Sequence, residues 1–269
     1  MWKKSPLTKY SKTIMDYEDM IHGENHICHI CGMVYEKYPM ISSCLDEFYQ
    51  KDEEKGISPY REIYSYTMNS IYLHFAHTVQ YCKEVLKKEN FGDWLDIGSG
   101  DPWITKEMQK YGSGWSWDPG FDHTRNFKSD PRSRFDLVTC MNMLEHVYAP
   151  IEFLQNMHPL VSNFGNLILC VPYVYTNSIT MHKDQWFSNA HIHHFDINSL
   201  DNTCLLAGWK IDSVQLLYEE MGQKIYVRCK KIRPKQPVFN FNKEKVSRAK
   251  DFISLQNQVW LAGNDMKVV

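Results

Sequence analysis

Glu145 and His146 form an adjacent carboxylate and imidazole shortly after the strand-like run Phe135-Asp-Leu-Val-Thr-Cys140. A histidine that titrates near neutrality is a natural general base, and a neighbouring carboxylate can orient it. We therefore expect His146 to accept a proton from a substrate or to orient that substrate. We expect Glu145 to orient His146 or to bind a substrate hydroxyl. The alternative is that the pair only caps the strand and holds a loop.

A second group of histidines, His191-Ile-His-His194, follows a long loop that contains Trp and Tyr. Such a loop could lie over the mouth of a substrate site. We expect His191 to contact the substrate. The alternative is a helix entry whose histidines form local hydrogen bonds, with Asp196 or Asn198 as the cap. Metal binding by this group is disfavoured, because no acidic ligand accompanies the histidines closely.

A glycine loop, Gly98-Ser-Gly100, lies between the strand-like run Trp94-Leu-Asp-Ile97 and a helical stretch. Glycine lets the backbone turn tightly and lets a ligand approach it. A dinucleotide fingerprint would have a third glycine where Trp103 stands, which disfavours a pyrophosphate cradle. Asp118 ends the next strand-like run, and an acid about 20 residues after the loop can bind ribose hydroxyls. Ribose without pyrophosphate indicates an adenosyl cofactor.

The amino-terminal region contains one Cys-x-x-Cys-Gly knuckle, formed by Cys28 and Cys31. Tetrahedral zinc needs four ligands, so His22 or His26 and also Cys44 would have to complete a metal site. Two interpretations stay open: a zinc site that includes Cys28 and Cys31, or a pair of reduced structural cysteines.

Strand-like and helical segments alternate through residues 91–235, which predicts βαβ units and a mostly parallel sheet. The last two strands, 209–217 and 224–229, are joined by a connection too short for a parallel crossover and should pair antiparallel. Residues 1–90 form an amino-terminal segment with the knuckle and a helical stretch, expected to recognise the substrate or cover it. Residues 236–269 are expected to form a carboxy-terminal helical arm.

The chain has 269 residues with 30 basic and 32 acidic side chains, and its formal net charge is −2. It lacks the basic footprint of a dedicated nucleic-acid binder. It also lacks an apolar run of about 18 residues and a signal-peptide pattern, so no membrane span or leader is expected. Most of its cysteines are scattered singly, several within apolar runs, which indicates reduced thiols and a cytoplasmic protein.

Four motifs occur in an order and spacing that resemble class I S-adenosylmethionine-dependent methyltransferases. These are Leu95-Asp-Ile-Gly-Ser-Gly100, Trp117-Asp-Pro119, Phe135-Asp-Leu-Val-Thr-Cys-Met-Asn-Met-Leu-Glu-His-Val147 and Gly165-Asn-Leu-Ile-Leu-Cys-Val-Pro172. The Leu-Glu-His-Val element and the later His191-Ile-His-His-Phe195 resemble the small-molecule branch, which includes ubiquinone-type O-methyltransferases and sugar C-methyltransferases. The Cys28 knuckle also resembles half of the zinc-binding amino-terminal module of the sugar enzymes.

The resemblance implies a Rossmann-like α/β fold with a mostly parallel seven-stranded sheet flanked by helices, an antiparallel last strand and an amino-terminal helical or knuckle segment. It also implies S-adenosylmethionine as the cofactor. The residues expected to hold this cofactor are Asp96, Gly98, Ser99, Gly100, Asp118, Pro119, Met141 and Asn142. The chain departs from the family at Asp101-Pro102-Trp103, where many relatives have a third glycine.

The sequence therefore predicts a cytoplasmic methyltransferase that acts on a small molecule through a carbon, oxygen or nitrogen acceptor. No nucleic-acid or membrane partner is expected. Two alternatives stay open. One is an RNA or protein methyltransferase, against which the near-neutral charge counts. The other is a catalytically silent cofactor-binding scaffold, which Pro102-Trp103 in the cofactor loop keeps open.

Overall fold

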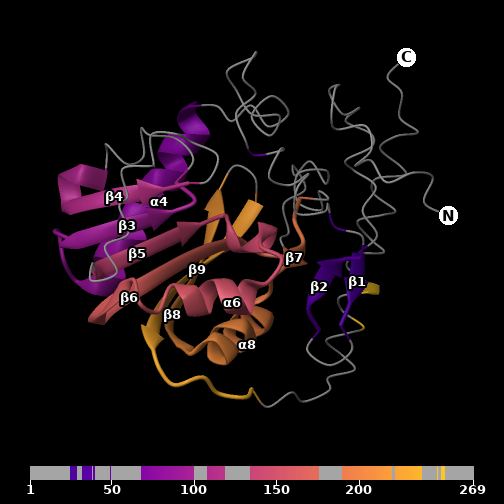
Figure 1. Cartoon of the computed structure of the whole chain (residues 1–269). Coiled ribbons are helices and arrows are strands. Elements are labelled where there is room, and N and C mark those ends of the chain that lie inside the picture. Colours follow the sequence, from indigo (N-terminus) through magenta and orange to yellow (C-terminus); the bar gives the residue numbers. More distant parts are fainter. Residues whose placement is uncertain are drawn as a thin grey trace, which may run out of the picture.

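The computed structural model describes residues 25–28, 32–37, 39, 49, 68–99, 108–118, 134–175, 190–219, 222–237, 247 and 250–251. Within these residues a central sheet carries helices on both of its faces (Figure 1). The arrangement is the Rossmann-like α/β fold expected from the alternation of strand and helix patterns. Most of the expected carboxy-terminal arm and the loop after residue 175 lie outside the described residues.

The central sheet has six strands in the described residues, in the order β4-β3-β5-β6-β9-β8. The strands are β3 (Asp93–Ile97), β4 (Ser113–Trp117), β5 (Phe135–Met141), β6 (Val161–Pro172), β8 (Trp209–Glu219) and β9 (Gly222–Lys231). The pairs β3–β4, β3–β5 and β5–β6 are parallel, whereas β9 pairs antiparallel with both β6 and β8. The parallel sheet and the antiparallel final hairpin are both confirmed.

Alternate side chains of the buried strands enter two hydrophobic cores. Trp94 and Leu137 pack with helix α4 (Met68–Leu86) on one face. Their neighbours Leu95 and Val138 enter the core of the other face, where helices α6 (Pro150–Asn156) and α8 (Ile197–Ala207) contact each other. A sheet covered on both faces explains why its central strands are nearly continuous apolar runs.

Helix α8 begins and ends at residues whose types favour helix termini. Asp196 accepts a hydrogen bond from Ser199 N at 2.7 Å, and Ser199 Oγ accepts one from Asp196 N at 2.9 Å, which completes a capping box. Gly208 ends the helix with a φ of 84°, in the left-handed region that glycine adopts readily. Of the two expected caps, the structure selects Asp196.

A second, three-stranded sheet joins the amino-terminal region to the rest of the protein. Strands β1 (Asn25–Ile27) and β2 (Val34–Glu36) form a hairpin, and β2 pairs antiparallel with β7 (His193–His194). Figure 1 shows the hairpin beside β7. Two of the histidines singled out in the sequence therefore belong to a strand, and the amino-terminal hairpin is held next to them.

Two short 3₁₀ helices, η2 (Gln109–Tyr111) and η4 (Leu144–His146), complete the described elements. Thiols in the interior are free and buried, as the sequence indicates; they belong to Cys82, Cys140, Cys170, Cys204 and Cys229. In the part of the chain that the structure describes, none of the helices combines the length and apolar character that crossing a membrane requires.

Candidate active site

The expected cofactor residues that the structure describes meet at one edge of the central sheet. Parallel strands β3, β4 and β5 end there at Ile97, Trp117 and Met141. Gly98 N donates a hydrogen bond to Trp117 O at 2.8 Å, so the loop after β3 is joined to the end of β4 next to Asp118. The carboxyl edge of an open parallel sheet is where such folds bind ligands. Gly100 and Pro119 lie outside the described residues.

Gly98 is fixed by both its backbone conformation and its surroundings. Its φ is 76°, and a Cβ added there would lie 2.5 Å from Met143 Sδ. The loop after β3 and the segment after β5 therefore approach each other more closely than another residue type would allow. This close approach places Met141 and Asn142 beside the glycine loop, as the resemblance implies.

Asp96 is buried within strand β3, just before the edge of the sheet. Its side chain is 6% exposed and accepts a hydrogen bond from Thr139 Oγ1 at 2.6 Å. Burial, together with a smaller effect of the nearby charge of Asp118, raises the pKa of Asp96 to about 7. The two carboxyl groups are thus close enough to repel each other, and a cationic group bound between them would relieve that repulsion.

Glu145, His146 and His191, which the sequence singled out separately, come together in the structure. One ligand atom from each lies within 4.8 Å of the other two, and the rings of His146 and His191 are 4.6 Å apart. Ile192 N donates to Glu145 O at 2.7 Å, which ties the segment carrying His191 to helix η4. We call these three residues the Glu145 cluster. Glu145, the first residue of this cluster along the chain, lies three positions after Asn142, at the same edge of the sheet.

The hydrogen bonds of His146 determine its tautomer. Its Nδ1 lies 2.8 Å from Ala190 O, and a carbonyl oxygen only accepts, so Nδ1 carries the proton. Tyr49 Oη is also 2.8 Å from Nδ1, so a residue of the amino-terminal region contacts this ring. Nε2 is left with its lone pair and faces Glu145 Oε1 at 3.7 Å. His146 is therefore oriented to accept a proton at Nε2.

Burial keeps the Glu145 cluster largely uncharged. The pKa of Glu145, which is 2% exposed, rises to about 8 because burial disfavours the carboxylate. Burial and the neighbouring His191 hold the pKa of His146 well below its usual range. Although the two groups are close enough for an ion pair, a neutral acid next to a neutral imidazole is the state that burial favours at pH 7.

Two imidazoles and a carboxylate are also a donor set found in zinc and iron sites. Among the described residues, Glu145, His146 and His191 are the group with this spacing. The Cys28–Cys31 knuckle, for which zinc binding is one of two open interpretations, is described only in part. Cys28 is half-buried, and its backbone closes the turn of the β1–β2 hairpin through Met33. Cys31 lies outside the described residues.

A second polar cluster lies at the same edge, on the face covered by α4, and sequence reasoning missed it. His74 Nδ1 contacts both carboxylate oxygens of Glu219, at 2.9 and 3.2 Å. His74 Nε2 lies 3.0 Å from Asn142 Nδ2, and Tyr226 Oη donates to Glu219 Oε1 at 2.6 Å. Lys224 Nζ forms an ion pair with Glu219 Oε2 at 3.0 Å. We call these five residues the His74 cluster.

The sequence does contain a signal for this cluster. His74 and Thr78 are four residues apart on the side of α4 that also presents Phe75 and Cys82 to the core. A polar pair within an apolar helical stripe indicates a buried polar contact. Its partners could not be identified, since Asn142 is 68 residues away along the chain and Glu219 is 145.

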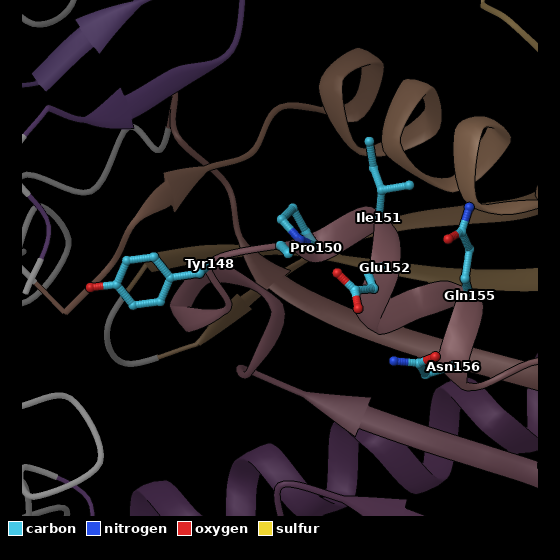
Figure 2. A pocket seen from close by; sticks show the side chains of 7 residues that line it. Tyr148, Pro150, Ile151, Glu152, Gln155 and Asn156 are labelled. Carbon is cyan, nitrogen blue, oxygen red and sulfur yellow. The ribbon is translucent and has the colours of Figure 1, made fainter. Parts of the chain in front are cut away.

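One hollow on the surface of the described residues lies along α6. It has a volume of about 730 Å³ and is lined by Tyr148, Ala149, Pro150, Ile151, Glu152, Gln155 and Asn156. Figure 2 shows these side chains spreading in different directions from one short segment. Because the polar groups do not converge there, we place the candidate active site at the sheet edge instead.

The Rossmann-like fold and the glycine loop at the carboxyl edge of its sheet together define a class I S-adenosylmethionine-dependent methyltransferase. The chain belongs to the methyltransferase-domain family, whose model matches residues 69–214. No curated protein sequence shows significant similarity to it.

Solved methyltransferases share the fold at low sequence identity. A 1,6-didemethyltoxoflavin N1-methyltransferase from Burkholderia thailandensis, solved with 1,6-didemethyltoxoflavin and S-adenosylhomocysteine, has a TM-score of 0.54 and 13% identity over 78% of this chain and 99% of that one. Magnesium protoporphyrin IX methyltransferase from Synechocystis has a TM-score of 0.45 and 12% identity over 61% of this chain and 84% of that one. A putative methyltransferase from Bacillus halodurans has a TM-score of 0.43 and 10% identity over 57% of this chain and 98% of that one.

Proposed function

We propose that this methyltransferase acts on a small molecule whose acceptor atom lies between the cofactor edge and the Glu145 cluster. The observation that carries the proposal is the convergence of Glu145, His146 and His191 at the edge where β3, β4 and β5 end. A methyl transfer needs the acceptor aligned with the sulfonium and shielded from water. A buried cluster of this kind can hold a small polar acceptor in that position.

The cofactor's contacts are assigned to the residues that the sequence singled out. Asp118 binds the ribose hydroxyls, Asp96 lies next to the cationic methionine portion, and Gly98 allows the backbone to approach it. The remaining contacts come from Ser99, Gly100, Pro119, Met141 and Asn142. The raised pKa of Asp96 supports this assignment, because a bound cation would favour its ionised form.

The Glu145 cluster is assigned to the acceptor. His146 takes the acceptor's proton or orients the acceptor, Glu145 orients His146 or binds a substrate hydroxyl, and His191 contacts the substrate. The free lone pair on His146 Nε2 supports the first role. The protonated state that burial favours in Glu145 supports the second, because a neutral carboxyl group can donate a hydrogen bond to a hydroxyl oxygen.

The amino-terminal segment, residues 1–90, is proposed to recognise or cover the substrate. Two contacts support this: β2 pairs with β7 next to His191, and Tyr49 contacts His146. Residues 91–235 would form the methyltransferase domain, and 236–269 an appended arm. A cytoplasmic location and partners limited to small molecules, without nucleic acid or membrane, complete the proposal.

Binding and transfer are tested separately. Calorimetry with S-adenosylmethionine and S-adenosylhomocysteine should show micromolar affinity, about −8 kcal/mol. Transfer of a radioactive methyl group is then measured on sugar, quinol and heterocyclic amine acceptors, with total RNA and protein as competing acceptors. Label in a small molecule alone supports the proposal. Label in RNA or protein would replace it, and binding without any transfer would favour the silent scaffold.

A further inference from the structure

His74 is held with its proton on one nitrogen and its lone pair on the other. Both contacts of Nδ1 with Glu219 are to a carboxylate, which only accepts, so Nδ1 carries the proton. Nε2 then accepts a hydrogen bond from the side-chain amide of Asn142 at 3.0 Å. A carboxylate that fixes the proton on one nitrogen of an imidazole, so that the other nitrogen is an acceptor, is the arrangement of a general base and its orienting residue.

The lone pair of His74 is directed at the side chain of Asn142, at the carboxyl edge of the sheet. Asn142 follows β5 directly and has a φ of 50°, an uncommon conformation for a residue other than glycine. Residues held in such conformations concentrate at active sites and ligand clamps. An acceptor's X–H group that reaches His74 Nε2 would replace the Asn142 amide in this hydrogen bond.

Charge distinguishes His74 from His146 as a proton acceptor. Burial alone would raise the pKa of Glu219, but Lys224, His74 and Tyr226 outweigh it and hold that pKa far below its usual range. Glu219 is therefore an anion at pH 7, whereas Glu145 is mostly a neutral acid. An imidazolium formed at His74 would face a carboxylate at 2.9 Å. An imidazolium formed at His146 would face the neutral carboxyl group of Glu145 instead, at 3.7 Å.

We propose, building on the methyltransferase function above, that His74 is the catalytic base for the acceptor and that Glu219 is its positioning residue. The acceptor atom X attacks the methyl carbon, the C–S bond breaks with its electron pair on sulfur, and the proton of X–H passes to His74 Nε2. The imidazolium later returns the proton to solvent. His146 is left with the task of orienting the acceptor.

The surroundings of His74 keep it unprotonated at rest. Burial lowers its pKa, Lys224 and His77 lower it further, and Glu219 opposes them. Tyr226 Oη lies 3.1 Å from Nδ1. Cys170, on neighbouring strand β6, donates to Asn142 Oδ1 and bears no charge at neutral pH, because burial raises its pKa. The base is thus available at neutral pH, and its activity should decline only in acid.

The first test uses single-turnover methyl transfer as a function of pH. His74→Gln should lower the rate by roughly 10²–10⁴-fold, the usual contribution of a general base. It should also lose the acid limb of the profile, while S-adenosylhomocysteine affinity stays within about threefold. Glu219→Gln should give a smaller loss and move the limb to lower pH, because the imidazolium loses its anion. Added imidazole should restore part of the rate in His74→Ala.

His158→Gln is the matched control, because His158 is also a histidine with a burial-lowered pKa, yet it binds Ala207 O beside α8. It should keep the wild-type rate and acid limb. If His74→Gln folds and binds cofactor but transfers methyl at the wild-type rate, His74 is not the base, and the small-molecule function still stands.

A second test needs no acceptor. Nitrogen chemical shifts of the histidine rings in the S-adenosylhomocysteine complex should show His74 as the Nδ1–H tautomer at pH 7. The Nε2–H tautomer in the wild type would overturn the assignment. Absence of transfer to every small molecule, with the Nδ1–H tautomer present, would instead count against the proposed substrate class.

Discussion

The carboxyl group of Asp96 is buried between β3 and β5, and its pKa of about 7 makes cofactor binding sensitive to pH. Below this pKa Asp96 is protonated, and a bound cation favours the ionised form. We therefore expect S-adenosylmethionine affinity to be roughly five- to tenfold weaker at pH 6 than at pH 8, as a difference of one unit between pH and pKa implies. Calorimetry at both pH values checks this. In Asp96→Asn the difference should vanish, and its persistence would assign the titration to another group.

Asp118 contributes a hydrogen-bonding carboxylate to the ribose in the proposed site. Asp118→Ala should weaken S-adenosylhomocysteine binding by about 1.5–3 kcal/mol, the range for hydrogen bonds to a charged group. Asp201→Ala, on helix α8, is a matched control and should bind normally. Equal affinity of the Asp118 variant and the wild type in calorimetry would remove the ribose assignment.

His146 is expected to act in transfer and not in cofactor binding. His146→Ala should lower kcat by roughly 10²-fold or more, because the acceptor loses a group that orients it. Cofactor affinity should change by less than about threefold. A variant that loses thermal stability and cofactor binding together would show that the ring only supports the fold around Ala190 and Tyr49.

At the level of elements, the loop after β3 depends on a glycine more than on any side chain. Gly98→Ala would impose a strained φ of 76° and bring its Cβ to 2.5 Å from Met143 Sδ. We expect a loss of stability of about 1–3 kcal/mol together with loss of cofactor binding. Gly208→Ala, with a φ of 84° at the end of α8, should lose comparable stability and keep its cofactor affinity. Thermal unfolding and calorimetry on both variants separate strain from binding.

The strands could be predicted from sequence because the central ones are buried on both faces and read as apolar runs. Element ends were harder to predict. The residue pattern after Pro150 does not show that α6 ends at Asn156, where Met157 to Leu160 turn toward β6. Strand β6 begins at Val161, ahead of its apolar run Leu167 to Val171, and a register shift opposite Phe135 and Leu137 accommodates the extra residues.

The candidate site was predictable where its residues are adjacent or follow a known spacing, as in Glu145-His146 and Gly98. The His74 cluster was not, because its members come from α4, the end of β5 and the final hairpin. A local sequence pattern cannot show that Tyr226 contacts an imidazole 152 residues away along the chain. Only the folded sheet, which places Tyr226 opposite Cys170, brings them together.

For the molecule as a whole, buried acids and histidines give the free energy of unfolding a maximum as a function of pH. Glu145 has a folded pKa of about 8, above its unfolded value, so the stability it contributes is lost as pH rises toward 8. The lowered pKa values of His74, His146, His193 and His194 have the opposite effect and reduce stability as pH falls below about 6.5. Maximum stability of the unliganded protein should therefore lie near neutral pH.

Glu145→Gln tests the alkaline side of this optimum. Denaturant unfolding should show that the free energy of unfolding falls less from pH 6 to pH 8 in the variant than in the wild type. The difference should be about 1–2 kcal/mol, since each unit of pKa shift is worth about 1.4 kcal/mol. Glu152→Gln on the surface of α6 should leave the wild-type difference unchanged. An identical loss in Glu145→Gln would show that this carboxyl group is ionised in the folded protein at pH 6.

The pairing of the amino-terminal hairpin with β7 has a consequence for biosynthesis. Strand β2 ends at Glu36, but its partner strand begins only at His193. At about 5–20 residues per second, the ribosome needs roughly 8–30 s to make the intervening chain. A two-stranded hairpin is barely stable alone, and during this delay its open edge can pair with another nascent chain. Slow translation or high expression should therefore favour aggregation through residues 25–36, and a chaperone that covers this edge would raise the yield of folded enzyme.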